Sequence, residues 1–233
     1  MTTRIHQCDH ATLARTVGRV DVLVSDPPFS PRVHDGQACR RADGSIGMAT
    51  DGIGVDYDAW TDAHIHDFVA TWSPRVARWM VILCSHDLIP VYEHAFRDAG
   101  RYVHAPVPCI IRGMSVRLRG DGPSSWAVYA VVARPRGMLP LSGTLQGAYV
   151  GSRERLLMRG AKPRWLMHAI LNDYTRDIDV VCDPCASSGT TMITARELGR
   201  ISIGAEPNAE RYAIMRGRLD AVTSPRVTRG VAR

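Results

Sequence analysis

The sequence predicts an α/β fold in which a mostly parallel sheet is covered by helices on both faces. Short apolar, β-rich runs alternate with segments of helical periodicity, which is the pattern of strand–helix–strand units. The length of 233 residues suits one domain with a full core better than two independent domains. A hydrophobic fraction of 45% and a charged fraction of 22% are typical of a globular protein.

The elements follow in order along the chain. Apolar runs bounded by turn residues predict strands at Val20–Ser25, Trp79–Cys84, Tyr102–Ile111, Trp126–Ala133, Asp179–Cys182 and Ile201–Gly204. Helical periodicity predicts helices at Trp60–Arg78 (interrupted near Ser73-Pro74), Asp87–Ala99, Pro163–Tyr174, Thr190–Leu198 and Ala209–Leu219. We expect a single domain over residues 1–222 and a frayed polar tail over residues 223–233. Residues 30–57 form a long loop without periodicity, of a kind that is usually functional or disordered.

Charge and composition narrow the classes of partner. The formal net charge is +6, but residues 112–164 alone carry nine arginines and one lysine against one aspartate and one glutamate, a local net of +8. This segment predicts either a polyanionic partner or a solvated surface face. No apolar run is long enough to cross a membrane, and residues 1–7 lack the apolar stretch of a signal peptide, so a cytoplasmic protein is expected. Six scattered cysteines do not suggest a disulfide framework.

The first motif runs from Asp183 to Thr190 (Asp-Pro-Cys-Ala-Ser-Ser-Gly-Thr), between a predicted strand and a predicted helix. Small residues there let the backbone approach a ligand, and the helix N-terminus offers free N–H groups. Glu206 ends the next strand, where an acid accepts hydrogen bonds from ribose hydroxyls in nucleotide-binding α/β units. A tight structural turn is the alternative, and Cys182 with Cys185 leaves a redox dithiol as a further one.

The second motif, Asp26-Pro27-Pro28-Phe29, also ends a predicted strand. The lone pair of an exocyclic base amine is delocalised into the ring, so acceptors for its N–H groups help to expose it. Asp26 and the rigidly held Pro27 carbonyl are such acceptors. Phe29 offers an apolar face to a base rotated out of the duplex. An ordinary strand-ending turn is the alternative.

Together these motifs resemble those of the amino-group (N6-adenine and N4-cytosine) DNA methyltransferases. The catalytic motif precedes the cofactor motif, as in the circularly permuted β class of that family. Lys162-Pro163 resembles the family's segment before the cofactor strand, and Cys8-Asp9 resembles its Gly-Asp near the start. The resemblance covers nearly the whole chain. It departs from the family at Cys185, in place of an aromatic residue, and at Ser187, in place of the first glycine, whose Cβ is expected to crowd the methionine moiety.

The resemblance implies the class-I S-adenosylmethionine-dependent methyltransferase (Rossmann-like) fold with one antiparallel strand. It implies transfer of a methyl group from S-adenosyl-L-methionine to adenine N6 in DNA, because cytosine-N4 members more often begin the catalytic motif with Ser. The expected catalytic residues are Asp26, Pro27, Pro28 and Phe29. The expected cofactor-binding residues are Asp9, Lys162, Asp183, Cys185, Ser187, Gly189, Thr190 and Glu206. The same chemistry on cytosine N4 or an RNA base stays open, as does a non-catalytic DNA-binding protein on this scaffold.

DNA recognition is assigned to the basic residues and to one aromatic residue. The expected DNA-binding residues are Arg112, Arg117, Arg119, Arg136, Tyr149, Arg153 and Arg155, with Tyr149 as a candidate for stacking. Residues 134–160 are too short for an independent recognition domain, so relaxed or short sequence specificity is expected. A homodimer is possible. His64 and His66 have no convincing further metal ligands, so no metal is expected. No membrane partner is expected either, because no apolar run is long enough to cross a membrane.

Overall fold

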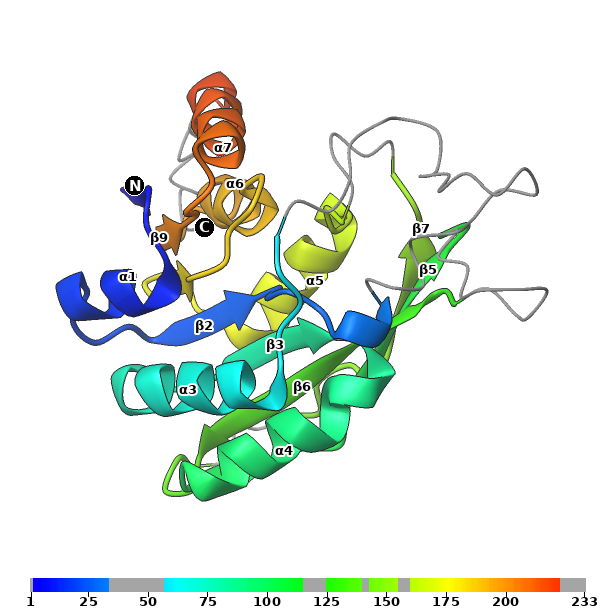
Figure 1. Cartoon of the computed structure of the whole chain (residues 1–233). Helices are drawn as coiled ribbons and strands as arrows, with labels where there is room; N and C mark the ends of the chain where they lie inside the picture. The colour runs from blue at the N-terminus through cyan, green and yellow to red at the C-terminus, as the bar shows by residue number, and fades with distance from the viewer. Residues whose placement is uncertain (1, 34–56, 115–124, 140–142, 155–159, 223–233) are drawn as a thin grey trace, which may run out of the picture.

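The computed structural model describes residues 2–33, 57–114, 125–139, 143–154 and 160–222, which build one mixed sheet flanked by helices (Figure 1). The described strands are β1 (Thr3–His6), β2 (Val22–Ser25), β3 (Met80–Cys84), β4 (Arg101–Val103), β5 (Val107–Arg112), β6 (Ala127–Pro135), β7 (Tyr149–Ser152), β8 (Val180–Asp183) and β9 (Ile201–Ala205). The described helices are α1 (His10–Thr16), α3 (Asp62–Trp72), α4 (Ile89–Asp98), α5 (Arg164–Tyr174), α6 (Thr190–Glu197) and α7 (Ala209–Ala221), with short 3-10 turns at Ser73–Arg75 and His86–Leu88.

The strand order is β1-β9-β8-β2-β3-β6-β5-β7, with β4 also paired to β6. β6 runs antiparallel to β3, β4 and β5, and the remaining pairs are parallel. Among the described strands, β6 is therefore the one that runs against the others, as expected. The predicted class-I fold is confirmed by this topology and by the structural comparisons below.

The helices cover both faces of the sheet (Figure 1). Leu13 of α1, Phe68 of α3 and Tyr92 of α4 lie fully buried in one apolar cluster with side chains from β2 and β3. Leu166 and Ile170 of α5 belong to a second cluster, on the other face. α7 packs on α6 through a third, smaller cluster. Because both faces are covered, the central strands β2 and β3 are buried along their whole length.

Three of the described elements were not expected from the sequence. β1 is a short strand beside β9 with a polar sequence, and α1 has only seven residues, so neither carries a strong periodic signal. β7 lies within residues 134–160, which the sequence suggests are turn-like, and it pairs with β5. The predicted strand Tyr102–Ile111 is divided into β4 and β5, because Pro106 between them has no N–H to give to a ladder.

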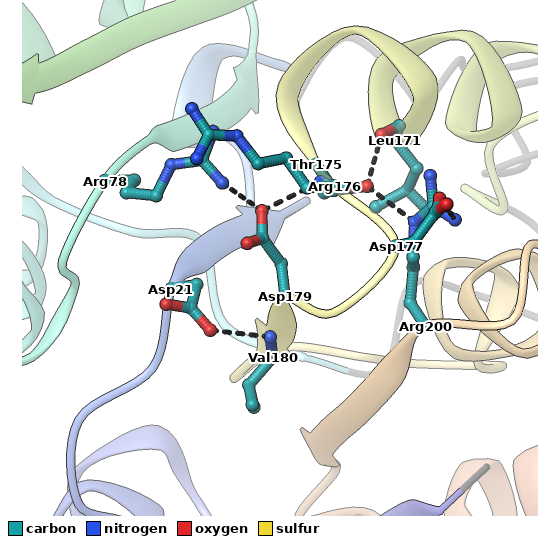
Figure 2. Close-up of polar contacts among 9 residues, drawn as sticks. All are labelled: Asp21, Arg78, Leu171, Thr175, Arg176, Asp177, Asp179, Val180 and Arg200. Carbon is teal, nitrogen blue, oxygen red and sulfur yellow. Dashed lines mark hydrogen bonds and ion pairs between the residues drawn. The ribbon is translucent and has the colours of Figure 1, made fainter.

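A polar network connects the amino ends of β2 and β8 (Figure 2). Asp179 accepts hydrogen bonds from Arg78 and from the Arg176 amide, and Asp21 accepts one from the Val180 amide at 2.8 Å. These contacts fix the turn that leads from α5 into β8. The edge opposite the two motifs is therefore held by charge-assisted hydrogen bonds.

Candidate active site

The two motifs meet at the carboxyl ends of adjacent parallel strands. β2 and β8 are paired, with Leu23 opposite Cys182, so the loops that follow them leave the sheet side by side. Ser25 Oγ, at the end of β2, donates to Asp183 Oδ1 at 2.7 Å. Ligands of open α/β sheets bind at this edge, so the predicted juxtaposition of the catalytic and cofactor motifs is present.

Asp26 is paired through one oxygen and unpartnered at the other. Its Oδ2 lies 2.5 Å from Lys162 Nζ, whereas its buried Oδ1 has no hydrogen-bond partner among the residues that the structure describes. Burial raises the pKa of the Asp26 carboxyl, and the positive charge of Lys162 opposes that rise. Lys162 Nζ also lies 4.8 Å from the centroid of the Phe29 ring, within cation–π distance. A buried acceptor without a donor is energetically costly, and it suits a ligand N–H group.

Asp183 is the buried carboxylate that organises the loop of residues 183–190 after β8, which carries the predicted cofactor motif (the cofactor loop). It is 1% exposed and accepts hydrogen bonds from Ser25 and from the Cys185 amide at 3.1 Å. Burial raises the pKa of Asp183 to about 6, against the opposing effect of hydrogen bonds from Thr191, Ser25 and the Cys185 amide. The carboxylate therefore holds the turn at a cost in desolvation.

The cofactor loop turns through left-handed backbone conformations. Ser187 has φ 47°, and it is the only non-glycine residue in the described part of the chain with positive φ. Gly189 has φ 81°, and a Cβ there would lie 2.5 Å from Met215 Cγ. Glycine is required at Gly189 for space and conformation, whereas Ser187 adopts a backbone that favours glycine. The backbone at position 187 therefore explains why the family has glycine where this chain has Ser187.

Glu206 directly follows β9, beside this loop. It is 5% exposed, and its carboxylate accepts hydrogen bonds from the Asn208 amide, at 2.9 Å, and from the Ser187 amide. Burial raises the pKa of Glu206. A carboxylate has about four acceptor sites, so two remain for a ligand. Asp9 follows β1, which pairs with β9, and it caps α1 by accepting from the Thr12 amide at 2.7 Å. Thr190, the first residue of α6, is 8% exposed.

Two residues that the sequence did not single out complete the site. The Tyr92 hydroxyl of α4 is buried and has no hydrogen-bond partner in the described ranges, and burial raises the pKa of this phenol, with Cys84, Cys185 and Asp26 adding to the rise. Asp87 follows β3 as Asp26 follows β2, and it accepts from Ser30 Oγ at 2.5 Å. The rule that functional groups follow the carboxyl ends of parallel strands could have found Asp87. The packing of α4 alone brings Tyr92 into the site.

Only part of the predicted DNA-binding group lies near this edge. Arg112 and Arg153 are exposed at the carboxyl ends of β5 and β7, where the Arg153 amide donates to the Arg112 carbonyl at 2.9 Å. Arg117, Arg119 and Arg155 lie outside the described residues. Arg136 follows the antiparallel strand β6, whose end pairs with the start of β4. Arg136 is therefore at the opposite edge of the sheet, and its grouping with Arg112 and Arg153 is corrected.

The predicted stacking role of Tyr149 is wrong. Tyr149 is 2% exposed, and its hydroxyl donates to Asp173 at 2.6 Å. It begins β7 and packs with α5 in the second apolar cluster. A side chain enclosed in this way cannot present its ring to DNA. The basic neighbours of Tyr149 in the sequence suggested an exposed position, but β7 turns its side chain into the core.

The redox and metal alternatives find no support in the site. Cys182 and Cys185 are free, and burial raises the pKa of both thiols, whereas redox dithiols have lowered thiol pKa values. His64 Nδ1 accepts from the Thr61 amide in the cap of α3. Within the described ranges, no three His, Cys, Asp or Glu residues are grouped to hold a metal ion. No described helix is both long enough and apolar enough to span a membrane.

Sequence comparison finds relatives for part of the chain, and the family match includes the predicted cofactor motif. Residues 148–216 match a family model described as DNA methylase, the N6/N4 type. The chain is 40% identical over 60 residues to the type II methyltransferase M2.DpnII of Streptococcus pneumoniae, and 43% identical over 58 residues to M.HindIII of Haemophilus influenzae. These matches cover 26% and 25% of this chain and only 22% and 19% of those two enzymes.

Structural comparison extends the similarity to nearly the whole chain. M1.HpyAVI in complex with S-adenosylmethionine matches with a TM-score of 0.68 at 20% identity, covering 94% of this chain and 100% of that one. A DNA modification methylase from Thermus thermophilus matches with 0.67 at 16% identity, covering 94% and 93%. The cytosine-N4-specific PvuII methyltransferase matches with 0.68 at 14% identity, covering 96% and 89%. These matches confirm the predicted resemblance to the amino-group DNA methyltransferases.

Proposed function

We propose that this protein transfers a methyl group from S-adenosyl-L-methionine to adenine N6 in DNA. The observation that carries the proposal is the buried Oδ1 of Asp26, which no described residue hydrogen-bonds, at the carboxyl end of β2 and beside the cofactor motif. An exocyclic amine needs such an acceptor, since hydrogen bonding to its N–H groups helps to expose the nitrogen lone pair. The family match over residues 148–216 and the fold support the assignment.

The residues of the cofactor loop fit S-adenosylmethionine. Glu206 keeps acceptor capacity for ribose hydroxyls, and the Asp183–Thr190 turn presents small side chains and the amino end of α6. Asp9 lies at the same sheet edge, after β1. Cys185 has a hydrogen bond with Ser25, the residue before Asp26. When bound there, the cofactor would supply an activated methyl group on a sulfonium.

The catalytic contribution of the chain is positioning and electrostatics, with no covalent enzyme intermediate. Asp26 Oδ1 would accept one N–H of the target amine, and the Pro27 carbonyl would accept the other. Phe29, partly buried against the core, would stack on a base rotated out of the duplex. Asp26 or solvent would then receive the proton that the methylated amine loses.

The target base is the finer part of the proposal. Asp26 begins the catalytic motif, as expected for adenine, whereas the structurally similar PvuII methyltransferase is cytosine-N4-specific. The assay is methylation of oligonucleotides and matching RNA, followed by nucleoside analysis. N6-methyladenine in DNA is the expected product; N4-methylcytosine, or modified RNA alone, would contradict the adenine assignment.

A non-catalytic DNA-binding protein on this scaffold is the alternative from another class. Departures from the family motif at Cys185 and Ser187 are its motive, and Ser187 has the strained backbone described above. Titration with S-adenosylmethionine in a calorimeter separates the two. We expect saturable binding; a protein that binds DNA but no cofactor would favour the scaffold.

We further propose short or relaxed sequence specificity. Tyr149 is unavailable, and the described basic side chains at the catalytic edge, Arg112 and Arg153, suit phosphate contacts that position DNA without reading it. DNA affinity should therefore fall steeply with salt. Methylation mapping on unmethylated genomic DNA tests this. A single long motif of fixed bases would contradict it.

A further inference from the structure

Lys162 is held against the proposed catalytic loop by three contacts. Its Nζ donates to Asp26 Oδ2 at 2.5 Å and to the Gly160 carbonyl at 3.2 Å, and lies 4.8 Å from the centre of the Phe29 ring. The Lys162 side chain is 10% exposed. The sequence suggested a cofactor contact for this residue, but in the structure its ammonium reaches the two side chains of the catalytic motif.

The contact with Asp26 is one-sided. Lys162 occupies Oδ2, and within the described part of the chain the buried Oδ1 stays without a partner. An ammonium is a compact point donor and can bind one carboxylate oxygen, whereas the planar fork of a guanidinium commonly binds both. An arginine here would therefore tend to close the oxygen that the target amine needs.

The composition of the chain also sets Lys162 apart. Of its 29 lysines and arginines, Lys162 is the only lysine. Whatever causes the general excess of arginine, the exception falls at the position where a fork-shaped cation would block the site. The residue type and the geometry therefore indicate the same requirement, a cation that binds one oxygen only.

The electrostatic surroundings make this cation necessary. Burial raises the pKa of Asp26, while the charge of Lys162 and its hydrogen bond lower it. Among the described residues, the other titratable groups that act on Asp26 would not favour its ionised form, because they are neutral or negative. These facing titratable groups are Asp183 after β8, Cys185 in the same loop, Cys84 at the end of β3 and Tyr92 in α4.

We propose that Lys162 is a positioning residue for methyl transfer, which keeps Asp26 ionised through one oxygen and leaves the other oxygen for the target amine. This inference rests on the function proposed above. It assigns Lys162 to the catalytic carboxylate instead of to cofactor affinity.

The test is single-turnover methylation of a defined oligonucleotide at saturating S-adenosylmethionine, measured across pH for the wild type, Lys162→Met and Lys162→Arg. In Lys162→Met we expect the acidic limb of the rate profile to move up by about one to three pH units, because an opposite charge at this distance lowers a carboxyl pKa by that amount. Cofactor affinity should stay near the wild-type value. In Lys162→Arg we expect the rate to fall by roughly tenfold or more at every pH. This is the cost of losing one hydrogen bond to a charged group.

Arg164→Met is the matched control. It removes the same charge two residues along the chain, from a half-exposed side chain that pairs with Glu197, so its rate profile should follow the wild type. Thermal unfolding and cofactor titration check that each variant is folded. If Lys162→Met does not fold, Lys162→Arg, which keeps the charge, decides.

The inference is overturned if Lys162→Arg methylates at the wild-type rate. It is also overturned if Lys162→Met keeps the wild-type acidic limb and loses cofactor affinity instead, since Lys162 would then serve the cofactor. A wild-type protein without activity on any nucleic acid would overturn the proposed function together with this inference. That failure is recognisable because it does not depend on the variants.

Discussion

Replacing Asp183 by asparagine should stabilise the ligand-free protein at neutral pH. Asp183 is 1% exposed, and burial raises the pKa of its carboxyl from 3.8 to about 6. Each pH unit of such a difference corresponds to about 1.4 kcal/mol, so ionised Asp183 costs the folded state about 3 kcal/mol above pH 6. Asparagine has the same shape and no charge, and its oxygen can still accept from the Cys185 amide.

The direction of the pH dependence follows from the raised pKa. Between 3.8 and about 6 the folded protein binds more protons at Asp183 than the unfolded chain does. The contribution of this group to stability is therefore complete below pH 3.8 and is lost as the pH rises through about 6. Asp183→Asn removes that loss, so the unfolding free energy of the variant should rise relative to that of the wild type as the pH rises.

The assay is urea unfolding of wild type and Asp183→Asn at a series of pH values. The difference in unfolding free energy should be near zero around pH 4 and should approach about 3 kcal/mol at pH 8. The comparison between the two proteins cancels the titration of the other carboxyls. A difference that stays constant with pH would refute the reasoning.

Four further substitutions test the site. Asp26→Ala should abolish methyl transfer and leave cofactor affinity near wild type by calorimetry; transfer within about tenfold of wild type would exclude the proposed role. Glu206→Ala should weaken S-adenosylmethionine binding by roughly tenfold or more, through the loss of charged hydrogen bonds, and unchanged affinity would remove Glu206 from the site. Ser187→Gly should leave cofactor binding equal or tighter, because glycine relieves the backbone at φ 47°; a severe loss would reveal a serine contact. Tyr149→Phe should lower the unfolding free energy by about 1 kcal/mol with the lost bond to Asp173 and leave DNA affinity unchanged, whereas weaker DNA binding by a stable variant would restore Tyr149 to the interface.

Most of the fold could be predicted from the sequence because its signals are local. The apolar runs of β2, β3 and β8 and the periodic helices α5 and α7 lie within a few residues of their expected bounds. The elements without such signals were missed. β1 has a polar sequence, and β7 is formed by pairing with β5, which no short window of sequence contains.

The candidate site divides in the same way. Asp26 and Asp183 could be placed together in advance, because each ends a parallel strand and parallel strands share a carboxyl edge. Tyr92 could not be placed, since its position depends on how α4 packs against the sheet. The basic residues could not be sorted either, because one strand direction decides which edge each of them occupies.

By itself the sequence determined the two motifs, their order and the chemistry that their residue types allow, since these depend on neighbours along the chain. The tertiary structure decided what depends on distant contacts. It brought Lys162 to Asp26 across 136 positions, turned Tyr149 into the core and put Arg136 at the opposite edge through the reversed direction of β6. A local pattern specifies the conformation of a loop, but only packing decides which side chain pairs with its carboxylate, and with it the charge state on which the proposed reaction depends.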